Sequence, residues 1–168
     1  NITFNNTVDS ETDTMGGSEA NDLVINTPGG GTTVFNADVG EATDGELGNI
    51  TTDAAGPTTV ADGVTVTTID DQTYNDEVNA TNATFNGDDI TATVATNDFM
   101  GTTSFNATGD ATITDENDID FGNSAIDGNL VLISGGNVTD SGNVTVTGMT
   151  TITAVGNVLL DEAGTDLG

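Results

Sequence analysis

Three short segments decide the fold that this sequence predicts: Thr112-Ile-Thr114, Leu130-Val-Leu-Ile133 and Thr151-Ile-Thr153. They follow one another at intervals of about 20 residues. Two of them alternate threonine with isoleucine, and a period of two is typical of a β-strand with one buried face. A constant interval between similar strands is typical of a repeat protein, in which each strand lies over the one before it.

Two further sets of segments keep the same interval on either side of the first set. They are Ile119–Phe121, Val138–Thr139 and Val158–Leu160, and Ser104–Asn106, Ala125–Ile126 and Val144–Val146. Three short strands in a period of about 20 residues make one rung of a parallel β-solenoid. At about 21 residues a rung, 168 residues predict about eight rungs and a rise of roughly 38 Å.

The rest of the chain also consists of short segments whose residue types are typical of strands and turns. Further strand candidates are Asn1–Phe4, Leu23–Ile25, Thr32–Phe35, Val64–Ile69 and Ile90–Val94, and no window shows a helical apolar stripe. An aromatic residue followed by Asn recurs, as in Phe85-Asn86 and Phe105-Asn106. We therefore predict an all-β chain with essentially no helix, with Phe and Leu in a narrow core and Asn and Thr stacked in ladders. Repeats of β-sandwich type are the alternative.

The composition excludes several classes of function. The chain has 28 acidic residues and no Lys, Arg, His or Cys, which gives a formal charge of −28. It cannot neutralise phosphates, so nucleic acid and anionic membrane surfaces are not expected partners. Imidazole and thiolate metal sites, and nucleophiles activated by His, are excluded as well. No apolar run is long enough for a transmembrane helix, so no membrane insertion is expected.

The second half of the chain also carries a resemblance to a known family. The segments Asn97–Gly101, Thr112–Gly122, Asp127–Leu132 and Gly136–Gly148 resemble the β-strand repeats of large bacterial surface proteins of the filamentous-haemagglutinin type. The resemblance implies a right-handed β-helix, secretion, and a stalk or adhesive role at the cell surface. The lack of Lys and Arg, and an acidic insert at residues 11–19, depart from that pattern.

The densest group of acidic residues lies in Asp115-Glu-Asn-Asp-Ile-Asp120. If the chain turns here, Asp115, Asp118 and Asp120 could converge with Asn117 into the oxygen cage that calcium prefers. The spacing is not that of an EF-hand loop. The alternative is an ordinary corner turn that Asp and Asn favour. The sequence thus offers one candidate calcium site and requires no cofactor.

Adjacent carboxylates raise the question of catalysis. They occur at Asp70-Asp71, Asp76-Glu77, Asp88-Asp89 and Asp161-Glu162, and pairs of carboxylates can hydrolyse glycosides. Enzymes that cleave acidic polysaccharides generally also hold the sugar with cations, which this chain lacks. We therefore predict that the protein is not an enzyme and has no catalytic residues.

The sequence favours a single solenoid segment, residues 1–168, that forms one link of a longer array. We expect the links to form an extracellular filament, stalk or sheath, by head-to-tail self-association or as tandem repeats. An adhesin that binds a sugar or protein is the alternative, and a carbohydrate-active enzyme is less favoured. Asp166-Leu-Gly168 read on into Asn1-Ile-Thr3 nearly repeats the internal phrase Glu46–Thr51. We accordingly expect Asn1–Phe4 to lie one rung beyond Val158–Leu160 or Val144–Val146 of a neighbouring link.

Overall fold

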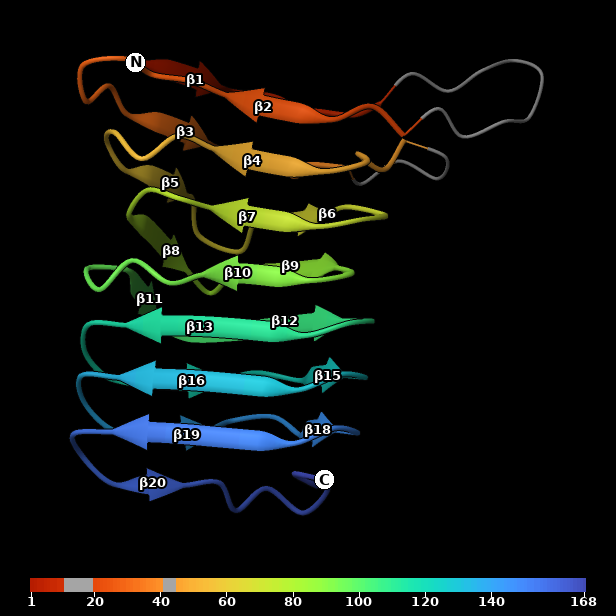
Figure 1. Ribbon diagram of the computed structural model, residues 1–168, viewed down its shortest axis with the longest axis vertical. Helices are drawn as coiled ribbons and strands as arrows, with labels where there is room; N and C mark the ends of the chain where they lie inside the picture. The colour runs from red at the N-terminus through yellow and green to blue at the C-terminus, as the bar shows by residue number, and fades with distance from the viewer. Residues whose placement is uncertain (11–19, 41–44) are drawn as a thin grey trace.

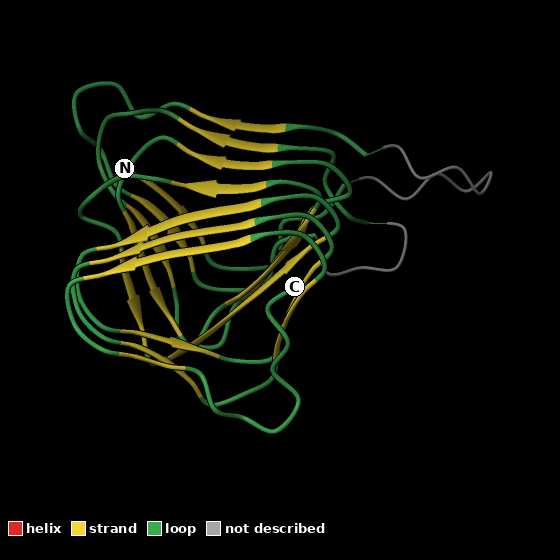
Figure 2. Ribbon diagram, turned by 60° about the horizontal axis from the view of Figure 1, so that its bottom comes forward, coloured by secondary structure: helices red, strands yellow, loops and turns green. Residues whose placement is uncertain are grey.

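The computed structural model describes residues 1–10, 20–40 and 45–168. They form a parallel β-solenoid, in which the chain coils around one narrow core (Figures 1 and 2). The described residues contain no helix, and therefore none that is long and apolar enough to cross a membrane. The acidic insert at residues 11–19 lies outside the described part of the chain.

Three faces make up each turn of the solenoid. We call the first the seven-stranded face: β2 (Leu23–Ile25), β4 (Ile50–Thr52), β7 (Gln72–Tyr74), β10 (Ile90–Ala92), β13 (Ala111–Asp115), β16 (Leu130–Ser134) and β19 (Thr150–Ala154). Every pairing in it is parallel. From its first strand to its last, the face marks about six turns, close to the eight rungs that the sequence predicts.

The other two faces complete each rung. The β1 face holds β1 (Ile2–Phe4), β3 (Thr33–Phe35), β5 (Thr58–Val60), β8 (Val78–Thr81) and β11 (Asp98–Met100), and β14 (Ile119–Phe121), β17 (Val138–Asp140) and β20 (Val158–Leu159) continue it. The β12 face holds β6 (Thr65–Thr67), β9 (Thr84–Gly87), β12 (Thr102–Ala107), β15 (Ser124–Ile126) and β18 (Val144–Val146). The long β12 pairs with both β14 and β15 and so links these two faces.

The coil is right-handed. In Figure 1 the nearer strands of the seven-stranded face run from right to left, β20 returns from left to right, and the chain descends from the N-terminus to the C-terminus. This is the usual hand for parallel strands joined by a crossover.

The register confirms the three repeating sets of segments. Thr112 pairs with Val131, and Val131 with Thr151. In the two other sets, Asn106 pairs with Ala125 and Ile119 with Val138. The rungs are longer near the N-terminus, where Leu23 pairs with Ile50, 27 residues on.

Aromatic rings pack against one another in two clusters inside the solenoid. Phe85 and Phe105 stack with ring centroids 5.5 Å apart, and Phe99 meets Phe105 edge to face at 5.4 Å. Phe4 and Phe35 stack in the same way at 5.2 Å. In both stacks the next residue along each chain segment is Asn, so the repeated aromatic-Asn step places rings inside and amides outside. Edge-to-face and offset pairs of this kind add to the stabilisation that comes from burial alone.

Candidate functional site

Asp115, the first of the three predicted calcium ligands, points into the core. It ends β13 with 1% of its surface exposed, and its Oδ1 accepts a hydrogen bond of 2.9 Å from the Phe99 amide. Its Oδ2 has no hydrogen-bond partner. Burial raises the pKa of this carboxyl to about 6, and the charges of Asp98 and Glu116 act in the same direction.

Asp118 and Asp120 lie in different surroundings from Asp115. Asp118 is exposed and accepts bonds from the backbone and side-chain nitrogens of Asn137 at 2.6 and 3.0 Å, which hold the pKa of Asp118 below its usual value. Asp120 occupies an outward position of β14 and accepts bonds from the hydroxyls of Thr102 and Thr139.

The structure therefore does not assemble the predicted cage. Side chains along β14 alternate between the core and the solvent, and Asp120 faces the solvent, whereas Asp115 at the end of β13 faces the core. Across the described ranges, no three acidic side chains come together in a group that could hold a metal ion. Calcium binding stays a prediction, which melting curves with and without calcium at matched ionic strength would test.

Two carboxylates from the four acidic pairs, those of Asp76 and Asp88, accept hydrogen bonds from threonine hydroxyls of the same chain. Asp88 accepts a bond of 2.8 Å from the Thr108 hydroxyl. Asp76 is buried and accepts bonds from the hydroxyls of Thr52 and Thr58 at 2.5 and 2.8 Å. Burial raises the pKa of Asp76, although these two hydrogen bonds oppose the shift. Each of these groups bonds to its own chain on a neighbouring rung.

The sequence predicts stacked Asn and Thr, but a ladder of Asp and Asn along one corner was not among its predictions. A residue of this ladder stands directly before each of the first six strands of the seven-stranded face, and its side-chain oxygen accepts the backbone N–H at the same place on the next rung. The series runs Asp22, Asn49, Asp71, Asp89, Asp110 and Asn129, and ends on the amide of Met149, before β19. The bonds are 2.7 to 3.2 Å long. The signal in the sequence was an Asp or Asn before six of the seven strands.

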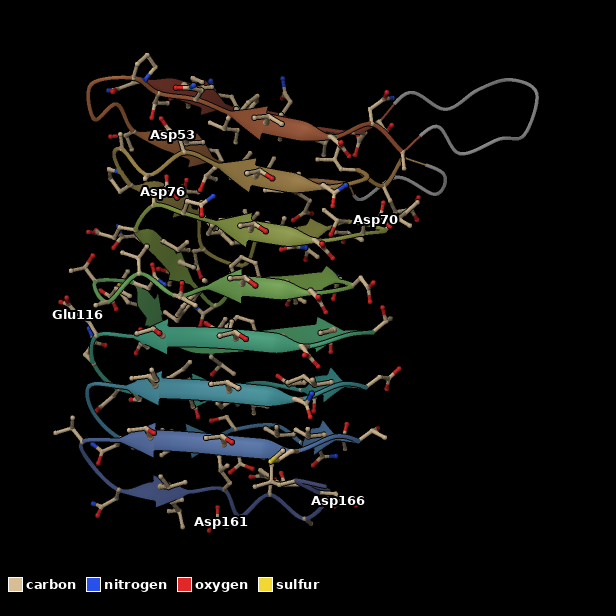
Figure 3. The ribbon with its side chains drawn as sticks, in the orientation of Figure 1. Asp53, Asp70, Asp76, Glu116, Asp161 and Asp166 are labelled. Atoms are coloured by element: carbon tan, nitrogen blue, oxygen red, sulfur yellow. The ribbon has the colours of Figure 1, made fainter. Side chains whose placement is uncertain are left out.

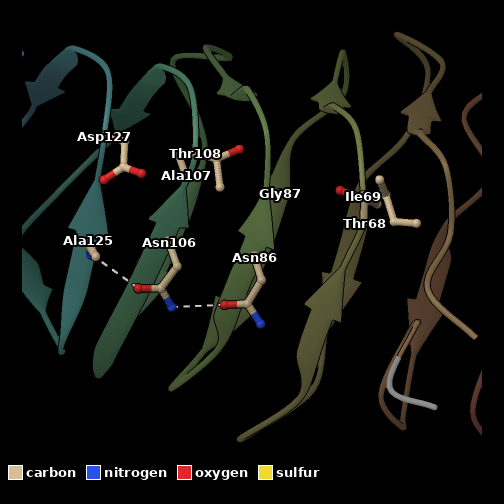
Figure 4. A pocket seen from close by; sticks show the side chains of 9 residues that line it. All are labelled: Thr68, Ile69, Asn86, Gly87, Asn106, Ala107, Thr108, Ala125 and Asp127. Atoms are coloured by element: carbon tan, nitrogen blue, oxygen red, sulfur yellow. Dashed lines mark hydrogen bonds between the residues drawn. The ribbon is translucent and has the colours of Figure 1, made fainter. Parts of the chain in front are cut away.

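A shallow groove of about 320 Å³ crosses the β12 face (Figure 4). The amide of Asn106 donates to Asn86 at 2.8 Å and accepts from the backbone of Ala125 at 3.1 Å. Thr108 and Asp127 line one end, and Asp127 is exposed. The amides of Asn86 and Asn106 in this groove therefore already bond to one another.

The comparisons with known proteins agree with a repeat architecture. Residues 108–168 match a family described as repeats of unknown function (DUF5649). This stretch contains β13 to β20, where the rungs are most regular. No curated protein and no solved structure matches the chain. Together with the fold, the match identifies a repeat β-helix protein.

Proposed function

We propose that the chain is a structural building block of an extracellular filament, stalk or sheath, in which rungs stack end to end. The observation that carries the proposal is the open last rung. Val158 in β20 is 50% exposed, whereas Val138, which holds the same inward position one rung earlier, is 0% exposed. A further rung, from the same polypeptide or from another copy, would bury it.

The polar chemistry of the chain supports a structural role as well. The corner ladder commits one side chain per rung to the backbone of the next rung, and the interior bonds of Asp76 also join rungs. Stacked parallel strands and side-chain ladders give a stiff rod, as in cross-β assemblies. The extracellular setting rests on the resemblance of residues 97–148 to surface-protein repeats.

The geometry of the two ends suggests how two copies would meet. Asn137 accepts the N–H of Asn157, the residue before β20, and Asn1 is the residue before β1 on the same face. Placing β1 over β20 would therefore let Asn157 accept the backbone N–H of Asn1. In each rung the strand of the seven-stranded face comes before the strand of the β1 face, but β2 comes after β1. This joint therefore leaves one strand position open on the seven-stranded face, between β19 of one copy and β2 of the next.

One expectation about the ends needs correction. Asn49-Ile-Thr51, in the internal phrase, leads into β4 on the seven-stranded face, whereas Ile2–Phe4 lies on the β1 face. The similar phrases thus occupy different faces, and their likeness does not predict the joint. Since β1 and β20 lie on the same face, the favoured position for Asn1–Phe4 is the one over Val158–Leu160.

The test uses a proline on the exposed edge of β20. Asn157 directs its N–H to Asn137 and its carbonyl to the Val138 amide, both on the preceding rung, so the amide of the next residue, Val158, points toward the open edge. Val158→Pro removes that donor and spares the bonds to β17. The matched control is Ala163→Pro, at the second position of the turn that the Thr165 amide closes on Glu162, where proline is well tolerated.

We expect the wild-type chain and Ala163→Pro to form rods one solenoid wide and many copies long in negative-stain images at high protein concentration. Val158→Pro should give short particles with an unchanged circular dichroism spectrum. Isolated particles for the wild-type chain at every concentration would overturn self-assembly, and so would rods of equal length from both variants.

A further inference from the structure

A second surface of the solenoid carries an inference that does not depend on end-to-end stacking. Seven outward side chains of the seven-stranded face form one row in register across the whole sheet. The row runs Val24, Thr51, Thr73, Thr91, Thr112, Val131 and Thr151. A second row, Thr114, Ile133 and Thr153, runs beside it on the last three strands. Every member of the two rows is β-branched.

Large apolar side chains in these rows are open to solvent. Val24 is 71% exposed, Ile133 49% and Val131 37%. Single exposed apolar residues need no explanation, but a contiguous patch commonly marks an interaction surface. Val131 and Ile133 lie two residues apart on β16, between threonines of β13 and β19. They form a small apolar patch one strand in from the β19 edge of the face, and apart from Val24 the other members of the two rows are threonines.

This face is free of charge in a chain that carries −28. No outward residue on its seven strands is acidic, and the one acidic residue in these strands, Asp115, points inward. On the β1 face, by contrast, Asp98 and Asp120 occupy outward positions. Figure 3 shows Glu116 and Asp70 at the two edges of the stack, to either side of the rows.

We infer that the seven-stranded face is a lateral interface, on which a second copy of this chain packs face to face. Like charges repel two copies wherever carboxylates would meet, and this face lets them approach without bringing charged side chains into contact. β-Branched side chains of two sheets interdigitate at a separation of about 10 Å. A self-complementary patch of this kind closes as a two-fold dimer.

The size of the face sets the strength of the pairing. Four of the seven strands have three residues and three have five, so at about 3.3 Å per residue and about 4.8 Å between strands the face covers roughly 430 Å² per copy. The two copies together would bury about 850 Å², somewhat less than the roughly 1,000 Å² that a stable specific interface needs. A single chain should therefore dimerise weakly, and pairing should strengthen as rungs are added. Salt should promote it by screening the flanking carboxylates.

Sedimentation velocity over a range of protein concentrations tests this inference, in about 50 mM and about 500 mM NaCl. Val131→Glu places a carboxylate in the apolar patch of the seven-stranded face, while Ala125→Glu adds the same charge at an exposed position of the β12 face. We expect a dimer that is favoured by salt, whose Kd rises at least about tenfold in Val131→Glu and is unchanged in Ala125→Glu.

The result is separable from end-to-end assembly. Val158→Pro, which blocks the rod, should still dimerise, and Val131→Glu should still form rods that fail to pair side by side. A chain that stays monomeric at high salt when the rods are blocked would overturn the inference. Equal weakening by Val131→Glu and Ala125→Glu would overturn it too, since the effect would then come from total charge.

Discussion

Replacing Asp115 by asparagine should stabilise the protein at neutral pH. The carboxyl is 1% exposed, and its pKa is raised from 3.8 to about 6. A rise of about two pH units means that the ionised form costs the native state up to about 3 kcal/mol. Since the folded pKa lies above the unfolded value, the proton stabilises the fold below about pH 4. That stability is lost as the pH rises through about 6.

Asparagine removes the charge and keeps the acceptor for the Phe99 amide. Its NH₂ group replaces Oδ2, which has no partner, and must find an acceptor of its own. Asn97, on the neighbouring rung, donates its amide to the carbonyls of Ala92 and Thr114 at 3.0 and 3.1 Å, so this corner can satisfy an amide. If imperfect pairing of the new amide costs about 1 kcal/mol at either pH, Asp115→Asn should gain up to about 2 kcal/mol at pH 7.5 and lose up to about 1 kcal/mol at pH 4.

Urea unfolding followed by circular dichroism at the two pH values measures the difference. The matched control is Asp161→Asn, which removes one charge at an exposed position and should show no such dependence on pH. If Asp115→Asn changes the free energy of unfolding by the same amount at pH 4 and at pH 7.5, the reasoning about burial is refuted.

Three other substitutions test the core, a corner and the ladder. Phe105→Ala removes a ring that contacts Phe85, Phe99 and Phe121, and should lower the free energy of unfolding in urea by about 3 to 5 kcal/mol. Gly135→Ala should lower it by about 1 to 3 kcal/mol, because a Cβ there would collide with the carbonyl of Glu116. Asp89→Asn keeps an acceptor for the Asp110 amide and removes the middle of three stacked charges. It should raise the melting temperature at low ionic strength, and the gain should vanish in about 1 M NaCl.

The second half of the fold could be predicted because its rungs are uniform. Leu130 pairs with Thr150 at an interval of 20 residues, so similar segments align without any structural information. The first half could not, since successive intervals there vary from 27 residues at Leu23 to 18 at Gln72. β7, Gln72-Thr-Tyr74, was missed because a buried glutamine does not look like a core residue.

The placement of the three candidate calcium ligands could not be predicted, for a related reason. Sequence spacing brings Asp115, Asp118 and Asp120 close along the chain, but it does not tell on which side of each strand a carboxylate falls. The end of β13 faces inward, the turn is exposed, and the middle of β14 faces outward. Three neighbouring carboxylates therefore take three different sets of hydrogen-bond donors.

The lack of cations explains where the charge lies. With no Lys or Arg, a carboxylate in this chain can be satisfied only by water, hydroxyls, amides or backbone N–H groups. The corners supply backbone N–H groups once per rung, as Asp89 and Asp110 show, and charge gathers along that line. The strands between the corners are left for threonine, valine and isoleucine. The same constraint that builds the acidic corner thus clears the seven-stranded face of charge, so the ladder and the lateral interface are two consequences of one composition.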